Sequence, residues 1–202
     1  LHIAGRHNVM NALAATACAV AAGVPLDAIA QGLSGFTPVK GRSRAFSVDH
    51  GERSITVVDD TYNANPDSMR AAIDVLAALP GPRLLVVGDM GEVGDQGPLF
   101  HAEAGAHAKT RGIELVFALG DQSAHVVDSF GAAGVHHSGI DSLNAAVVAA
   151  LPEVGSVLVK GSRFMKMERV VAAITATQQQ KQASEENTMP VTSTAVAGGA
   201  RC

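Results

Sequence analysis

Short runs rich in valine and leucine alternate with longer amphipathic segments from residue 55 to residue 175, and this alternation restricts the possible folds more than any other feature. The apolar runs are nearly continuous, which is typical of strands buried on both faces of a parallel sheet. Parallel strands need crossover connections, which the intervening helices supply in a right-handed sense. We therefore predict an α/β fold with a doubly wound, mostly parallel sheet, whose ligands lie at the carboxyl ends of the strands. The predicted strands are 55–58, 83–87, 113–119, 135–137 and 156–159, and the predicted helices are 66–79, 98–110, 122–130, 142–151 and 163–175.

The residues before this alternation have a helical pattern. Apolar side chains at helical spacing predict a helix from His7 to Gly23, with Asn8 placed to cap its start. A second helix is expected from Pro25 to about Leu33. The stretch "SGFTPVKGR" at 34–42 has the glycine and proline content of a connector, and we place a domain boundary there.

Two further segments lie beside the alternating region. The runs 44–48 and 54–58 on either side of "DHGE" predict a β-hairpin. From residue 178 onward the chain is polar and rich in glutamine, with neither the helical nor the strand period. This composition predicts a disordered tail.

The composition excludes several classes of protein. Hydrophobic residues make up 47% and charged residues 17%, so a core can form and global disorder is disfavoured. Aromatic residues make up only 3% and the net charge is −4, which argues against nucleic-acid binding through base stacking or phosphate contacts. The two cysteines make no disulfide framework, and the most apolar stretch, 12–24, is too short to span a membrane. We expect a cytoplasmic protein with no nucleic-acid partner and no membrane insertion.

Glycine-rich phosphate-binding motifs are missing from the sequence. The loop G-x-x-x-x-G-K-[ST], whose amides and lysine hold phosphates, does not occur. Its nearest approach, "GSVLVKGS" at 155–162, has lysine and glycine in the reverse order and lies on a predicted strand. The dinucleotide motif G-x-G-x-x-G is also absent after a strand. The histidine pairs 101/107 and 136/137 point in different directions on their elements, so no metal site is predicted.

Polar side chains follow the predicted strands at the edge where ligands are expected. They are Asp59, Asp60, Tyr62, Asn63 and Asn65 after the first parallel strand, Asp89 and Glu92 after the second, and Lys160, Ser162 and Arg163 after the last. Asp60 can accept hydrogen bonds from ribose hydroxyls, while Lys160 and Arg163 can hold a carboxylate or a phosphate. Turn formation and helix capping are the other interpretation of the Asn and Asp residues, and for Asn65 both interpretations stay open.

Three residues near the start of the chain are weaker candidates. Asn8 and Asn11 lie three residues apart on one helix face and can present amides to a purine edge. Arg42 can reach a phosphate from the connector, although an ordinary surface arginine is the simpler interpretation.

Five sequence blocks occur together in an order and spacing that resemble the Mur ligase family. They are "GRHNVMNALAA" at 5–15, "GR" at 41–42, "DDTYNANPDSM" at 59–69, "GDMGEVG" at 88–94 and "VLVKGSRFMKME" at 157–168. Within the family, "DDTYNANPDSM" and "KGSR" resemble the member that joins D-alanyl-D-alanine to UDP-N-acetylmuramoyl-tripeptide.

The resemblance implies a domain organisation. Family members have a UDP-sugar domain, a central ATPase domain and a carboxyl-terminal Rossmann-like domain. By resemblance, residues 1–41 are the helical end of the central domain, 42–176 form the carboxyl-terminal domain, and 177–202 match nothing in the pattern. The phosphate loop and the Mg²⁺ ligands then belong to the missing amino-terminal and central domains. We therefore expect no ligation by this chain alone.

The resemblance also implies a reaction and its binding residues. In the family, ATP phosphorylates a peptide carboxylate, and the incoming amine attacks the acyl phosphate to form an amide of the peptidoglycan precursor. By resemblance, Asn8 and Asn11 lie near adenine. Arg42 approaches the nucleotide phosphates, and Asp60 holds the ribose. The loops similar to those that meet the incoming amino acid contain Asn63, Asn65, Asp89, Lys160, Ser162 and Arg163.

Two other functions stay open on the sequence alone. A sister Mur ligase or a folylpolyglutamate synthase shares the fold and the mechanism. A non-catalytic α/β ligand-binding module would also explain the missing phosphate loop.

Overall fold

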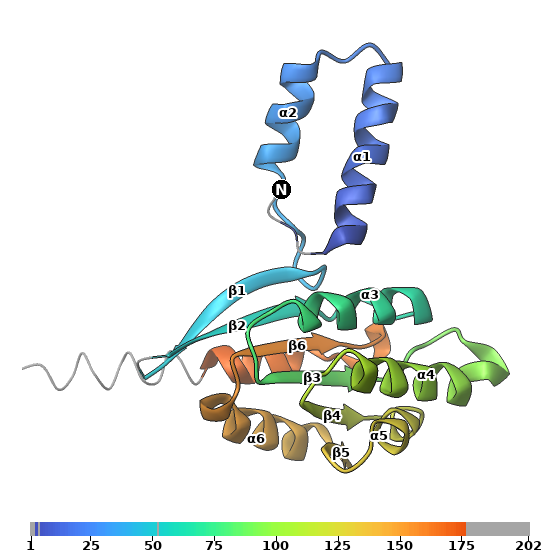
Figure 1. Ribbon diagram of the computed structural model, residues 1–202, viewed down its shortest axis with the longest axis vertical. Coiled ribbons are helices and arrows are strands. Elements are labelled where there is room, and N and C mark those ends of the chain that lie inside the picture. Colours follow the sequence, from blue (N-terminus) through green and yellow to red (C-terminus); the bar gives the residue numbers. More distant parts are fainter. Residues whose placement is uncertain (1–2, 4, 52, 177–202) are drawn as a thin grey trace, which may run out of the picture.

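The computed structural model describes residues 3, 5–51 and 53–176, and in it a helical hairpin stands out from a larger α/β domain (Figure 1). The hairpin consists of α1 (Arg6–Ala21) and α2 (Leu26–Gly35). Asn8 lies inside α1 and does not cap it, so that prediction was wrong. Gly5 takes the cap position instead, with a φ of 101° that suits glycine.

A six-stranded sheet forms the centre of the α/β domain, in the order β1-β2-β6-β3-β4-β5. Its first two strands form the predicted antiparallel hairpin, and all other neighbours pair in parallel. This arrangement confirms the predicted mostly parallel α/β fold. The strands are β1 (Arg44–His50), β2 (Arg53–Asp60), β3 (Arg83–Gly88), β4 (Leu115–Leu119), β5 (Gly134–His137) and β6 (Ser156–Lys160).

Helices cover both faces of the sheet, as a doubly wound fold requires (Figure 1). One face packs against α3 (Pro66–Ala77), α4 (Gly97–Thr110) and α5 (Ala124–Phe130), and the other against α6 (Ile140–Ala150) and a last helix at 168–176. Successive strand residues alternate between the two cores. Leu85 and Val87 face the first core, whereas Leu84 and Val86 face the second, and all are fully buried. This double burial explains why the strands read as continuous apolar runs.

The end of the chain departs from the predicted helix over 163–175. A short 3-10 turn, η3 (Arg163–Met165), comes first, and the α-helix starts only at residue 168. Lys166, between them, has a φ of 51°, which breaks the helical hydrogen-bond pattern. The other short turns are η1 (Gly94–Gln96) and η2 (Leu151–Glu153). The predicted tail at 178–202 lies outside the described residues, as does Cys202.

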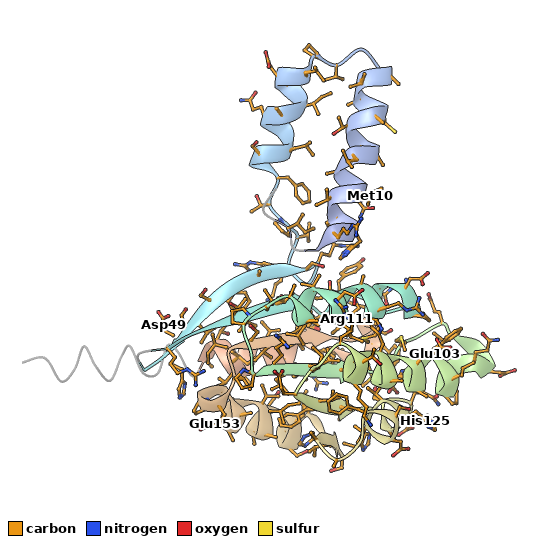
Figure 2. All side chains as sticks on the ribbon, in the orientation of Figure 1. Met10, Asp49, Glu103, Arg111, His125 and Glu153 are labelled. Atoms are coloured by element: carbon orange, nitrogen blue, oxygen red, sulfur yellow. The ribbon has the colours of Figure 1, made fainter. Side chains whose placement is uncertain are left out.

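The apolar face predicted for α1 is not covered by the rest of the described chain. None of the described residues of α1 or α2 is buried, and Val9, Met10 and Leu13 are about half exposed or more. Figure 2 shows Met10 on the helical hairpin, outside the packed α/β domain. In the described part of the chain, no helix combines the length and the apolar composition needed to cross a membrane.

Candidate functional site

Two charged residues, a hundred positions apart in the sequence, meet where β2 and β6 end. The strands are parallel neighbours in the sheet, and their register places Asp60 directly beside Lys160. Lys160 Nζ lies 2.6 Å from Asp60 Oδ2 and 2.9 Å from the carbonyl oxygen of Asn63. The lysine side chain is only 2% exposed and the aspartate 15%, so the pair is largely shielded from water. The structure therefore already gives Lys160 an anionic partner within the chain.

The second carboxylate oxygen of Asp60 contacts the connector. Ser43 donates two hydrogen bonds to Asp60 Oδ1, from its backbone N–H at 2.9 Å and from its hydroxyl at 3.1 Å. Ser43 has a φ of 50°, an uncommon conformation for a residue with a side chain. The neighbouring acid, Asp59, has other partners within the chain. It is 1% exposed and accepts hydrogen bonds from Thr61 and from the N–H of Gly41.

A cleft of about 370 Å³ opens above this ion pair, between the start of α1, the connector and the loop after β2. It gathers six of the ten residues to which the family resemblance gives a binding role. Those six are Asn8, Arg42, Asp60, Asn63, Asn65 and Lys160. Because α1, the connector and the two strand ends are remote in sequence, only the fold brings these side chains together.

Arg42 supplies the positive charge of the cleft. Its guanidinium lies 3.9 Å from the centre of the Tyr62 ring, a cation–π contact that holds it in place. Among the described residues Arg42 takes part in no ion pair, whereas Lys160 is paired with Asp60. Arg42 is therefore the cation of the cleft whose charge is free to bind an anionic group.

Asn11 lines an adjoining apolar pocket of about 280 Å³ between α1 and α2, and Asn8 lines both hollows. Asn11 Nδ2 donates to Asn8 Oδ1 at 3.3 Å, so the two amides lie on one helix face as predicted. The pocket is otherwise walled by small or apolar side chains, including Leu33 and Phe36. A planar apolar group with polar edges would suit this arrangement.

Asn65 caps α3, which was one of its two interpretations. Its Oδ1 accepts from the N–H of Ser68 at 2.8 Å, and the Ser68 hydroxyl accepts in return from the N–H of Asn65 at 3.0 Å. This reciprocal pair is a capping box, and Pro66 follows at the first helical position. Asn65 still lines the cleft, so capping and ligand contact do not exclude one another.

Three more of these residues, besides Asn11, lie outside the cleft, and they do not line the adjoining pocket either. Asp89 is 9% exposed, and its Oδ1 accepts from both the N–H and the hydroxyl of Ser123 at 2.7 Å. Ser162 is 2% exposed, accepts from the N–H of Gly91 at 2.5 Å and donates to the carbonyl of Ala64 at 3.1 Å. Both therefore hold loops together. The Arg163 side chain is 69% exposed and pairs with Glu168 at 3.5 Å. Its guanidinium also lies 5.9 Å from the centre of the Tyr62 ring.

Sequence reasoning missed Ser43. Nothing in the letters "GRSR" shows that the serine turns back onto Asp60, because a left-handed conformation at a non-glycine residue leaves no reliable sequence signal. Only its position beside Arg42 could have drawn attention to it. It lines the cleft together with Asp60 and Lys160.

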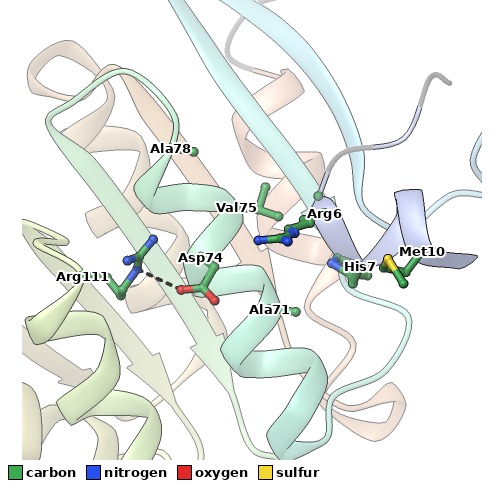
Figure 3. A pocket seen from close by; sticks show the side chains of 9 residues that line it. Arg6, His7, Met10, Ala71, Asp74, Val75, Ala78 and Arg111 are labelled. Atoms are coloured by element: carbon green, nitrogen blue, oxygen red, sulfur yellow. Dashed lines mark ion pairs between the residues drawn. The ribbon is translucent and has the colours of Figure 1, made fainter.

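A larger hollow of about 590 Å³ lies between the start of α1 and the outer face of α3, and it contains none of the predicted site residues (Figure 3). Its walls include Met10 and Val75. Asp74 in its wall accepts from Arg111 Nε and from His107 Nε2, each at 2.9 Å. These contacts join α3 to the end of α4, which gives Asp74 a structural role.

His101 is a fully buried histidine near the loop after β3. Its Nε2 accepts from the N–H of Met90 at 2.9 Å, so Nδ1 carries the proton and donates to the carbonyl of Gly97 at 2.7 Å. Burial lowers the pKa of His101 below its ordinary value of 6.5, although the bond to Gly97 and the charge of Asp89 oppose this shift. Burial likewise lowers the pKa of His137, and the neighbouring His136 adds to the effect.

We predict that the free energy of unfolding falls as the pH drops below about 6.5. The lowered pKa means that unfolded His101 takes up a proton before folded His101 does, so acid favours the unfolded state, while stability is fully present above 6.5. Urea unfolding between about pH 7.5 and about pH 5.5 measures this slope. In His101→Gln the free energy of unfolding should fall less steeply with decreasing pH, because the contribution of His101 is lost and that of His137 remains. An unchanged slope would show that His101 does not titrate in this way.

Comparison with known proteins identifies the family to which this chain belongs. The model of the Mur ligase glutamate ligase domain matches residues 43–163, more than half of the chain. The chain belongs to the Mur ligase family. This finding confirms the resemblance of the five sequence blocks.

Individual Mur ligases are similar over most of this chain. The UDP-N-acetylmuramoyl-tripeptide–D-alanyl-D-alanine ligase of Escherichia coli K12 is 42% identical over 176 residues, which are 86% of this chain and 38% of that protein. A crystal structure of MurF from Acinetobacter baumannii is 33% identical, with a TM-score of 0.74, over 84% of this chain and 37% of that one. A MurF ligase of Thermotoga maritima, solved in complex with ADP, shows the same fold at 22% identity, with a TM-score of 0.73, over 89% of this chain and 40% of that one. The chain thus spans well under half the length of these relatives.

Proposed function

We propose that this chain is the carboxyl-terminal part of an ATP-dependent ligase that joins D-alanyl-D-alanine to UDP-N-acetylmuramoyl-tripeptide. The main structural support is the cleft, which brings together residues from separate parts of the chain, namely Asn8, Arg42, Asp60 and Lys160. Similarity to ligases with this named activity over most of the chain favours it over a sister ligase. Membership of a ligase family favours it over a non-catalytic binding module.

In this proposal the cleft holds the nucleotide. The Asp60 carboxylate accepts a hydrogen bond from the ribose, and the unpaired guanidinium of Arg42 attracts the phosphates. Asn8 and Asn11 border the apolar pocket between α1 and α2, where a purine ring with polar edges would lie. The nucleotide thereby connects the helical hairpin to the α/β domain.

The dipeptide would approach the loops after β2 and β6. Asn63, Asn65 and Arg163 keep polar groups at or near the surface there, and Arg163 can bind the dipeptide carboxylate. Lys160, Ser162 and Asp89 are occupied by contacts inside the chain. We assign these three the task of holding the loops in position. Positioning the amine against the acyl phosphate is the main contribution that such a domain can make to the rate.

The domain organisation follows the same proposal. Residues 1–41 would be the helical end of a central ATPase domain and 42–176 the carboxyl-terminal domain, with Ser43 and Arg42 at the joint. The exposed apolar side chains of α1, such as Val9 and Leu13, would then pack against the remainder of the central domain. Mg²⁺ stays part of the proposal through the family resemblance alone. No group of three or more His, Cys, Asp or Glu in the described residues could hold a metal ion, and no step here uses one.

The test uses the complete ligase that carries this chain, with phosphate release measured in the presence of ATP, UDP-N-acetylmuramoyl-tripeptide and D-alanyl-D-alanine. Arg42→Ala and Asp60→Asn should each raise the KM for ATP about tenfold, because each removes a charged contact to the nucleotide. Asp49→Ala is the matched control, since Asp49 is an exposed acid at the opposite end of the same hairpin. The proposal would be disproved if phosphate release needed a different amino acid in place of D-alanyl-D-alanine. It would also be disproved if neither cleft variant changed the KM for ATP.

A further inference from the structure

The Asp60 carboxylate is close to saturation as a hydrogen-bond acceptor. An ionised carboxylate offers about four acceptor positions, two on each oxygen. Ser43 fills both positions on Oδ1, with its N–H at 2.9 Å and its hydroxyl at 3.1 Å. Lys160 Nζ takes one position on Oδ2 at 2.6 Å. A single acceptor position, on Oδ2, therefore stays available to a ligand.

A ribose requires more than this. Its neighbouring 2′ and 3′ hydroxyls present two donors, and a carboxylate that binds both must offer two free acceptor positions. One of the present donors has to leave. Lys160 is the costly one to move, because it is 2% exposed and would leave a buried charge without its partner. Ser43 is neutral and only partly buried.

We propose that Ser43 competes with the nucleotide ribose for Asp60. This competition determines how strongly the site distinguishes ribonucleotides from nucleotides that lack the ribose hydroxyls. Its N–H and hydroxyl occupy Oδ1 in the way that two ribose hydroxyls would. When a ribose binds, the serine hydroxyl withdraws and one ribose hydroxyl takes its place. This inference rests on the proposed nucleotide site.

The competition also links ribose binding to the connector. Ser43 has a left-handed φ of 50°, which its two bonds to Asp60 help to hold. The residue before it is Arg42, whose guanidinium lies on Tyr62 at 3.9 Å. A ribose that displaces the Ser43 hydroxyl therefore removes one of the two bonds that hold the segment carrying Arg42. Recognition of the ribose and placement of Arg42 become one coupled event.

The test compares ATP with 2′,3′-dideoxy-ATP in binding titrations of the complete ligase. Ser43→Ala removes the competing hydroxyl and keeps the N–H, so ATP should bind about threefold to tenfold more tightly. The dideoxy nucleotide should bind with unchanged affinity, because it lacks both hydroxyls. Ser43→Gly also removes the hydroxyl and tolerates the positive φ, so it should match the alanine variant. Ser47→Ala is the control, an exposed serine on β1 away from the cleft.

Each result decides between the possibilities. Tighter binding of ATP alone supports the competition. Unchanged or weaker ATP binding in both Ser43 variants overturns it, as does an equal gain for the two nucleotides. Asp60→Asn separates this inference from the proposed function. If that variant binds ATP as the parent does, the ribose site itself is absent, and the competition is excluded with it.

Discussion

Replacing Lys160 by methionine is expected to lower the free energy of unfolding by about 3 kcal/mol or more. Methionine has a similar length and fills the space, but it leaves the largely buried Asp60 carboxylate without its cation and the Asn63 carbonyl without its donor. A charge left unpaired in a shielded position costs more than the ion pair itself contributes. Urea unfolding followed by circular dichroism measures the loss.

Two comparison variants isolate the ion pair. Lys109→Met changes an exposed lysine on α4 and should shift the unfolding free energy by less than about 0.5 kcal/mol. The double variant Lys160→Met with Asp60→Asn removes the unpaired charge and should recover part of the stability. If Lys160→Met is as mild as Lys109→Met, the pair is not a supporting element of the sheet edge.

Replacing Gly105 by alanine should be about as damaging, at about 3 kcal/mol, because the backbone of α5 leaves no room for a side chain at this position of α4. A Cβ atom at Gly105 would lie 2.1 Å from the carbonyl oxygen of Val126 and 2.9 Å from its carbonyl carbon. Both atoms belong to the α5 backbone and cannot rotate away. The two helices must separate, which opens the core that Val126 and Phe130 fill. Thermal unfolding should show a melting temperature lower by about 5 to 10 °C.

Gly32→Ala is the matched control for this substitution. Gly32 also lies inside a helix, α2, but nothing is within 4 Å of its would-be Cβ. Alanine there should favour the helix by up to about 1 kcal/mol. Equal effects of the two substitutions would mean that helix propensity, and not the contact with Val126, controls the outcome.

Much of the fold was predictable because its signals are local. The bounds of β3 and α3 differ by no more than two residues from the predicted strand at 83–87 and the predicted helix at 66–79. Apolar runs and helix caps mark such elements in the sequence. The predicted start of the last helix was wrong because of Lys166, whose positive φ has no clear sequence signal. The exposure of α1 was equally hidden, because a hydrophobic pattern shows which face can be buried but not what buries it.

The candidate site was predictable only in part. Asp60 and Lys160 were singled out because each follows an apolar strand, yet the sequence could not show that they contact one another. For Lys160 that contact replaces a role in binding substrate with one in positioning the loop, as we propose. Asp89 and Ser162 were chosen by the same rule, and the structure places them in hydrogen bonds between loops, away from the cleft.

By itself, the sequence determined the α/β class, the succession of strands and helices along the chain, and the likeness to the Mur ligases. Periodicity, caps and short motifs are properties of neighbouring residues. The tertiary structure alone decided which polar groups are free. Ser43 contacts Asp60 across 17 positions, and Lys160 reaches it across 100. Hydrogen bonds and charge pairing depend on distance in space, so only the folded chain shows that Arg42 is available to a ligand while Lys160 is already paired.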